Sequence, residues 1–122
     1  MEKEFIPYEQ ALELKELGFK EKCGAHYLGE GEEYLELKWE IYRNDSINTS
    51  KLIQAPLYQQ AFRFFREKYE FTYSIGKTNI AVVHYGPTTQ LLQDNDSYEA
   101  AELAAIKWFI DVAKQIDNGK DQ

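Results

Sequence analysis

A length of 122 residues lies within the usual range of one domain, and a hydrophobic fraction of 43% is too high for a disordered segment. The formal net charge of -7 disfavours a protein that coats nucleic-acid backbone through many Lys and Arg contacts. We therefore expect a single folded domain over residues 1–122. Only residues 41–85 are net basic, with six Lys and Arg against three Asp and Glu.

Cysteine usage and the start of the chain bear on its compartment. Cys23 is the only cysteine, so no intramolecular disulfide can form, which fits a reducing cytoplasm. Four of the first ten residues are charged. No apolar run in the chain has the length of a signal peptide's apolar region or of a membrane span. We expect a soluble cytoplasmic protein that does not insert in a membrane.

The apolar spacing over residues 8–17 predicts a first helix. Pro7 suits its first helical position, where the missing N–H costs nothing. Gly18 suits the left-handed position that follows a helix, and Phe19 would then fold back onto Leu14.

Two hairpins are predicted, from period-two alternation in residues 34–42 and 71–75 and from the β-branched, apolar composition of residues 80–85. Residues 34–42 place apolar and charged side chains on opposite faces, and they pair with residues 23–28 through a Gly-rich turn. Residues 71–75 and 80–85 form the second hairpin around Gly76.

Two further helices complete the pattern. Pro56 is placed to open a helix that runs through Tyr69. After a loop at residues 86–95, Asp96 and Glu99 resemble a capping box that starts a helix ending near Ile116. We predict an α+β fold in which two antiparallel hairpins join as one four-stranded sheet packed with three helices, in the order α-β-β-α-β-β-α.

The second and third helices carry more apolar residues than one buried face needs. On the second, Phe64 and Leu57 lie beside Lys68 on a flank of the core face, so they meet either another element or a partner. On the third, Trp108 and Phe109 extend the apolar arc past half the circumference. That helix is either buried on more than one side or half of a two-fold dimer contact.

The sequence gives no positive sign of an enzyme, a metal or a cofactor. Cys23, His26 and His84 would be at most three ligands, whereas structural zinc needs four, so a buried thiol and two ordinary imidazoles are the preferred interpretation. No GxGxxG, GxxxxGK[ST] or HExxH motif is present.

Nucleic-acid recognition is the competing interpretation. Arg and Gln side chains read guanine and adenine edges, and the second helix carries Gln59, Arg63, Arg66 and Lys68. A solvated helix face explains the same residues. The overall acidity makes nucleic-acid binding the weaker alternative without excluding it.

Three segments together resemble a group of small uncharacterised proteins carried by bacterial phages and prophages. They are FIPYEQALELKELGF at residues 5–19, APLYQQAFRFFR at 55–66 and YEAAE at 98–102. The group's motifs are structural, so the resemblance implies a mobile-element origin and a compact mixed fold but no catalytic or ligand residue. Where the group often has a tryptophan on the second helix, this chain has Phe64.

From these features we expect a non-catalytic accessory protein that binds a second protein or a second copy of itself. The expected contact residues are Leu57, Phe64, Lys68, Trp108 and Phe109.

Overall fold

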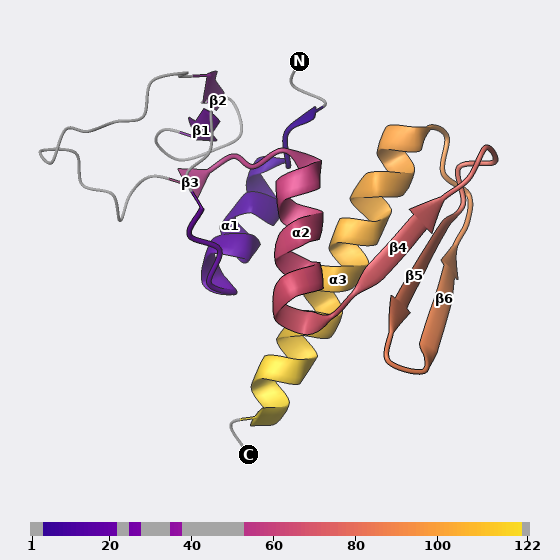
Figure 1. Ribbon diagram of the computed structural model, residues 1–122. Helices are drawn as coiled ribbons and strands as arrows, with labels where there is room; N and C mark the ends of the chain where they lie inside the picture. The colour runs from indigo at the N-terminus through magenta and orange to yellow at the C-terminus, as the bar shows by residue number, and fades with distance from the viewer. Residues whose placement is uncertain (1–3, 22–24, 28–34, 38–52, 121–122) are drawn as a thin grey trace, which may run out of the picture. The chain divides into compact units, whose positions relative to one another are not determined.

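The computed structural model describes residues 4–21, 25–27, 35–37 and 53–120 (Figure 1). The chain divides into two compact units, Met1–Tyr58 and Gln59–Gln122. The described residues form three helices, a three-stranded antiparallel sheet in the second unit and three short strands in the first. The α+β class is therefore confirmed, while the single domain stays a prediction.

Helix α1 (Tyr8–Glu16) ends as its sequence predicts. Gly18 has a left-handed φ of 102°, and the backbone N–H of Phe19 donates to the carbonyl oxygen of Leu14 at 3.0 Å. These features define a Schellman motif, which satisfies carbonyls that the helix leaves without an internal donor. Pro7 occupies the N-cap, one residue before the predicted position.

Three short strands follow in the first unit. Strand β1 (Ala25–Tyr27) pairs antiparallel with β2 (Leu35–Leu37) on one side and with β3 (Ile53–Gln54) on the other. The pairing of β1 with β2 confirms the first hairpin where the structure describes it. The remainder of the strand predicted at residues 34–42 lies outside the described residues. Strand β3 was not predicted.

Hydrogen bonds join the start of the chain to strand β1 and to the segment before the second helix. The Tyr27 hydroxyl donates to the carbonyl oxygen of Ile6 at 2.7 Å, and the N–H of Ile6 donates to the carbonyl oxygen of Pro56 at 2.8 Å. Leu57 forms an isolated antiparallel bridge with Phe5. The expectation that Leu57 lies on the helix is therefore wrong, because its backbone pairs as a strand.

Helix α2 (Tyr58–Tyr69) begins two residues after Pro56, later than predicted. It ends at Glu70, which has a left-handed φ of 62° and donates its N–H to the carbonyl oxygen of Arg66 at 3.1 Å. The predicted core face is confirmed. Its buried members are Tyr58, Ala61, Phe62, Phe65 and Tyr69.

The sheet of the second unit has the order β4-β5-β6, with both pairs antiparallel. Strands β4 (Thr72–Ile75) and β5 (Ala81–Tyr85) form the second predicted hairpin. Strand β6 (Thr88–Leu92) lies inside the segment predicted as a loop at residues 86–95, so the loop prediction is wrong.

The missed strand has a physical explanation. A two-residue turn of Gly86 and Pro87 connects β5 to β6, and Gly86 has the positive φ of 55° that the first position of such a turn favours. The Gly-Pro pair therefore closes a hairpin instead of opening a loop. Residues 88–91 are all exposed, so neither face of β6 had to be apolar and the alternation that reveals a strand is missing.

The described strands lie in two sheets, β2-β1-β3 and β4-β5-β6, and not in the single four-stranded sheet expected. Strand β5 already pairs on both sides, as does β1. Because β1 and β5 each have two neighbours, neither strand can pair with a strand of the other predicted hairpin.

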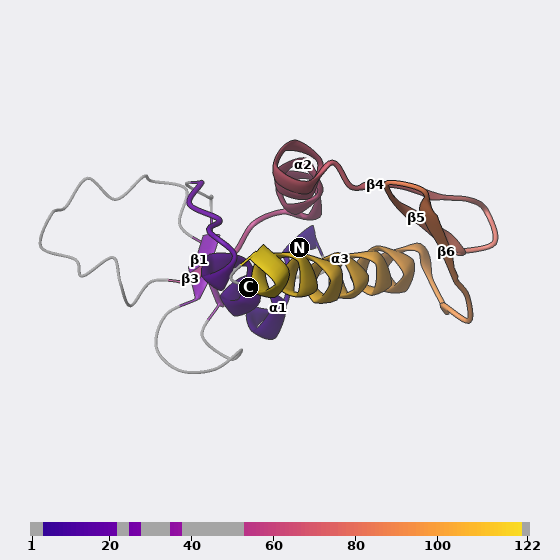
Figure 2. The ribbon, with the colours of Figure 1, turned by 90° about the horizontal axis from the view of Figure 1, so that it is seen from below.

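The capping residue of helix α3 (Tyr98–Lys120) is one position later than predicted, and the helix extends beyond the predicted end at Ile116. The N–H of Ala100 donates to Oγ of Ser97 at 3.1 Å, so Ser97 is the capping residue. The capping box of Asp96 and Glu99 is therefore wrong. In Figures 1 and 2, β6 is the strand of the sheet farthest from α2.

Candidate functional site

The flank of α2 that the sequence singles out is partly covered by its own helix. Phe64 is half-buried, and its ring meets the ring of Phe65 edge-on with 5.3 Å between centroids. The Nζ of Lys68 lies 5.6 Å from the Phe64 centroid and 5.4 Å from the Tyr69 centroid, within cation–π range. Part of Phe64 stays exposed. Leu57, 37% exposed, belongs to the other unit.

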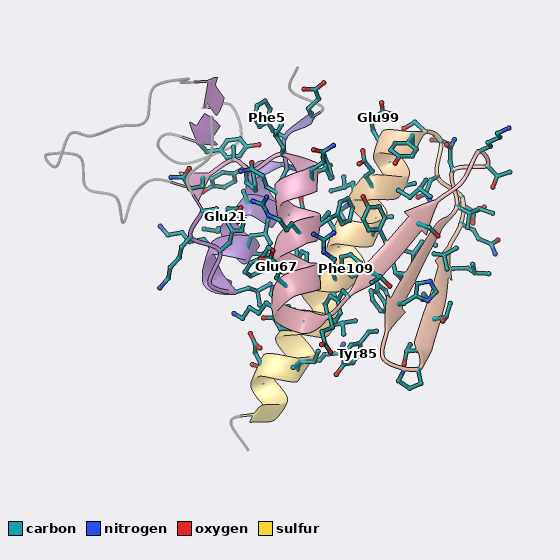
Figure 3. All side chains as sticks on the ribbon, viewed as in Figure 1. Phe5, Glu21, Glu67, Tyr85, Glu99 and Phe109 are labelled. Atoms are coloured by element: carbon teal, nitrogen blue, oxygen red, sulfur yellow. The ribbon has the colours of Figure 1, made fainter. Side chains whose placement is uncertain are left out.

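The polar residues proposed for nucleic-acid binding fall on two sides of α2. Gln59, Arg63 and Arg66 are exposed and follow one stripe at a spacing of four and three residues. Lys68 lies about 180° from Gln59 at about 100° per residue, so it does not join them. Glu67 is exposed four residues after Arg63 and places a negative charge beside the stripe (Figure 3).

The two rings of α3 differ in exposure. Phe109 is only 1% exposed and contacts the rings of Phe62, Phe65 and Phe71 at 5.1–6.0 Å between centroids. Trp108 is half-buried with its centroid 6.2 Å from that of Phe71. Phe109 is therefore enclosed by its own unit and does not form part of a surface, whereas part of Trp108 stays exposed.

A partly buried hydrogen bond joins the ends of the two long helices. The Tyr69 hydroxyl donates to Oδ2 of Asp117 at 2.9 Å. Burial raises the pKa of Tyr69 well above its usual value, and the hydrogen bond and negative charge of Asp117 raise it further. The neutral phenol is the form that suits this site.

A carboxyl and two phenols gather near the start of α3. Burial raises the pKa of Tyr73, the charges of Tyr98 and Glu102 raise it further, and Arg66 opposes them. Burial also raises the pKa of Glu102, with a further contribution from Glu99. A carboxyl of this kind holds a proton more readily than an exposed one and can donate a hydrogen bond.

One face of the sheet is open. The register places six residues on that face, while Ala81 and Val83 on the opposite face are fully buried. Nδ1 of His84 and Oγ1 of Thr89 are hydrogen-bonded across the strands at 3.1 Å. The six residues, which we name the open face, are Thr72, Ser74, Val82, His84, Thr89 and Leu91.

The open face is uncharged and carries Leu91, the most exposed leucine among the described residues. Lys77, in the turn between β4 and β5, is the only charged residue of residues 71–93, although 29% of the chain is charged. Leu91 is 52% exposed and pairs across the strands with Val82. Tyr85, at the end of β5 in Figure 3, is 37% exposed but lies on the opposite face, with Ala81 and Val83. Interface cores share this depletion of charge.

The residues considered as metal ligands belong to different elements of the chain. His26 lies in β1 and His84 in β5, and Cys23 lies outside the described residues. Among the residues that the structure describes, no three His, Cys, Asp or Glu side chains come together to hold a metal ion.

Sequence reasoning missed the open face because it relied on helix periodicity. The signal was the absence of charge: residues 78–93 contain no Asp, Glu, Lys or Arg. The whole chain has 21 acidic and 14 basic residues, so an uncharged stretch of this length is unusual in it. Such depletion of charge is typical of the core of an interface.

In the part of the chain that the structure describes, no helix has the length and hydropathy needed to cross a bilayer. No protein-family model, curated protein or solved structure matches the chain.

Proposed function

We propose that this chain is a non-catalytic, cytoplasmic accessory protein of phage origin that acts as a protein–protein interaction module. The phage origin is supported by the resemblance of three structural segments. The binding surface is the open face of the sheet, joined by the exposed part of the α2 flank at Phe64 and Lys68.

The observation that carries the proposal is the uncharged sheet. A chain of net charge -7 keeps its molecules apart in solution by repulsion, yet its three strands of the second unit carry no charged side chain. Leu91 is 52% exposed on that face. An exposed leucine on a surface that faces only water does not stabilise the protein. A partner that covers Leu91 removes its apolar area from water, which stabilises the complex.

The test compares Leu91→Lys with Gln115→Lys. Both add one positive charge at an exposed site, but Gln115 lies on α3 and not on the sheet. Each variant and the parent chain serve as bait in a lysate of the cells that encode the protein, and the solution mass of each is measured by light scattering. We expect a partner or a dimer that persists in Gln115→Lys and is lost in Leu91→Lys.

A parent chain that is monomeric and retains no specific protein contradicts the interaction module. The contribution of the α2 flank is measured separately with Phe64→Asp. If Phe64→Asp abolishes the association and Leu91→Lys does not, the surface lies on α2 and the assignment to the sheet is wrong.

The alternative function is a nucleic-acid-associated regulator. The observation that favours it is the exposed stripe of Gln59, Arg63 and Arg66. A mobility-shift assay with mixed DNA and RNA at low and high salt tests it, with Arg63→Glu combined with Arg66→Glu as the variant. Salt-sensitive binding that the variant loses supports the regulator, because such binding depends on phosphate contacts. The absence of binding at low salt excludes it.

A further inference from the structure

Strand β6 is an edge of its sheet. The order β4-β5-β6 leaves β6 paired on one side only among the described residues. Residues 88–91 are exposed, and within the second unit Figures 1 and 2 show no element beyond β6. An edge of this kind presents a row of backbone N–H and C=O groups that can pair with another strand.

This edge lacks the devices that normally prevent pairing. Natural edge strands are blunted by Lys, by Pro within the strand, by inward charges or by a bulge. The sequence of β6 is TTQLL, which contains no charged residue and no proline. Its register with β5 runs through five consecutive pairs from Tyr85–Thr88 to Ala81–Leu92, without a bulge.

The alternation of hydrogen-bonded and non-hydrogen-bonded pairs identifies the groups that point outward. In a hairpin closed by a two-residue turn, the flanking pair is hydrogen-bonded and the next pair is not. Tyr85 and Thr88 flank the turn. By alternation, Thr89 and Leu91 direct their backbone N–H and C=O groups away from β5, while Gln90 directs its groups toward β5.

We propose that a second copy of this chain pairs antiparallel with β6 about a two-fold axis at Gln90, which produces a continuous six-stranded sheet. The two outward-facing residues then exchange backbone hydrogen bonds, Thr89 of one copy with Leu91 of the other and the reverse. Leu91 then lies beside Thr89 of the partner copy on the same face of the sheet. The proposal rests on the proposed function, because it uses the same sheet and names the partner.

Charge and symmetry favour a second copy over a foreign strand. Two molecules of net charge -7 repel each other, and residues 78–93 are a stretch where they can meet without opposed carboxylates. The outward-facing residues Thr89 and Leu91 are equidistant from Gln90, so the strand is complementary to itself in an antiparallel register. A two-fold contact of this kind closes and does not propagate.

Two substitutions separate pairing at the edge from packing of the open face. Thr89→Pro removes an outward N–H, and proline is tolerated on an edge strand where its N–H faces solvent. Ser74→Lys adds a charge to the same open face but on β4. By sedimentation over a wide concentration range, we expect the parent chain and Ser74→Lys to approach twice 14.3 kDa. We expect Thr89→Pro to raise the dimer dissociation constant at least tenfold.

A cross-link reports the register directly and does not depend on how well Thr89→Pro folds. In the antiparallel pair centred on Gln90, the two Gln90 residues oppose each other as a non-hydrogen-bonded pair, with Cα atoms about 4.5 Å apart. In a chain that also carries Cys23→Ser, Gln90→Cys should oxidise to a covalent dimer. Gln93→Cys, three residues out of register, should remain largely monomeric.

The outcomes distinguish the two proposals. A parent chain that is monomeric at every concentration overturns self-pairing, and so does a dimer in which Gln90→Cys and Gln93→Cys cross-link equally. If such a monomer still captures a protein that Leu91→Lys loses, the interaction module stands with a foreign partner. A dimer lost in Ser74→Lys but kept in Thr89→Pro shows face packing and overturns pairing at β6. A monomer that captures nothing overturns both proposals.

Discussion

At the scale of single residues, three phenylalanine rings form the centre of the second unit. Phe65, Phe71 and Phe109 are each at most 1% exposed, and their centroids lie 5.1–6.0 Å apart. Such ring pairs contribute more than their buried area alone. The neighbouring ring of Phe64 is only half-buried, so two adjacent positions of α2 offer the same side chain in two environments.

The first prediction compares these two positions. Phe65→Ala should reduce the free energy of unfolding by about 3–5 kcal/mol, because it leaves a cavity among packed rings. Phe64→Ala should cost less than half as much, since its ring is already partly in water. Urea unfolding of both variants measures the difference. Equal losses would show that Phe64 belongs to the core, which would remove it from the proposed surface.

The second prediction concerns Tyr69 and alkaline pH. Because the folded chain holds the pKa of Tyr69 above its usual value of 10.0, the unfolded chain releases this proton first. Between these two pKa values the folded chain binds more protons, so stability is complete below pH 10 and falls as pH rises. Tyr69→Phe should lose about 1 kcal/mol at neutral pH with the hydrogen bond to Asp117.

The loss of stability above pH 10 should also be shallower in Tyr69→Phe than in the parent chain. Denaturant unfolding at several pH values measures both quantities. Tyr73, whose pKa is also raised, keeps part of the slope in the variant. Parallel pH profiles for the two proteins would mean that Tyr69 titrates as it does in the unfolded chain.

At the scale of elements, α1 and α2 end through the same left-handed position with different residues. In α1 the residue is Gly18, and in α2 it is Glu70, with φ values of 102° and 62°. A residue with a Cβ is strained there, because the Cβ approaches the following carbonyl oxygen. Glycine has no Cβ and is the usual residue at this position.

The third prediction follows as a pair of opposite signs. Gly18→Ala should destabilise the chain by about 1 kcal/mol, and Glu70→Gly should stabilise it by a similar amount. Both residues are exposed, so lost packing does not complicate the comparison. Thermal unfolding checks both signs. A destabilised Glu70→Gly would show that the Glu70 side chain makes a contact worth more than the backbone strain.

The β5–β6 hairpin is the element on which the proposed interactions depend. Its stability as part of the monomer comes from one face, where Ala81 and Val83 are buried. The other face and the β6 edge contribute little to the monomer. Substitutions such as Leu91→Lys should therefore change the free energy of unfolding by no more than about 0.5 kcal/mol, so their effect on association can be measured in folded protein.

At the scale of the whole molecule, charge is distributed unevenly along the chain. The net charge is -7, but the strands of the second unit carry no charged side chain. The uncharged sheet is where a second molecule can approach with the least repulsion between like charges. This separation is the physical basis of both proposals.

The fourth prediction concerns the unit Gln59–Gln122. Its two helices and three strands enclose their own aromatic core, so a fragment of residues 55–122 should fold without the remainder. Domains of about 60 residues are marginal but often fold alone. We expect cooperative thermal unfolding by circular dichroism, and none in the same fragment with Phe65→Ala. A fragment without a cooperative transition would show that this core needs the first unit.

Local features of the sequence determined the elements that are encoded locally. Apolar spacing located α1, α2 and α3, alternation located β4, and a β-branched, apolar composition located β5. Gly18 marked the end of α1 through its backbone freedom. These features depend on neighbours within a few residues, which is why one sequence suffices to read them.

Only the tertiary structure decided where the surplus apolar side chains go. The rings of Phe65 and Phe71 help to bury Phe109. These contacts join residues that are far apart in the chain. Strand β6 is defined by its pairing with β5, since its own side chains show no alternation of apolar and polar residues. Pairing partners and ring contacts depend on chain topology, and no local periodicity records them.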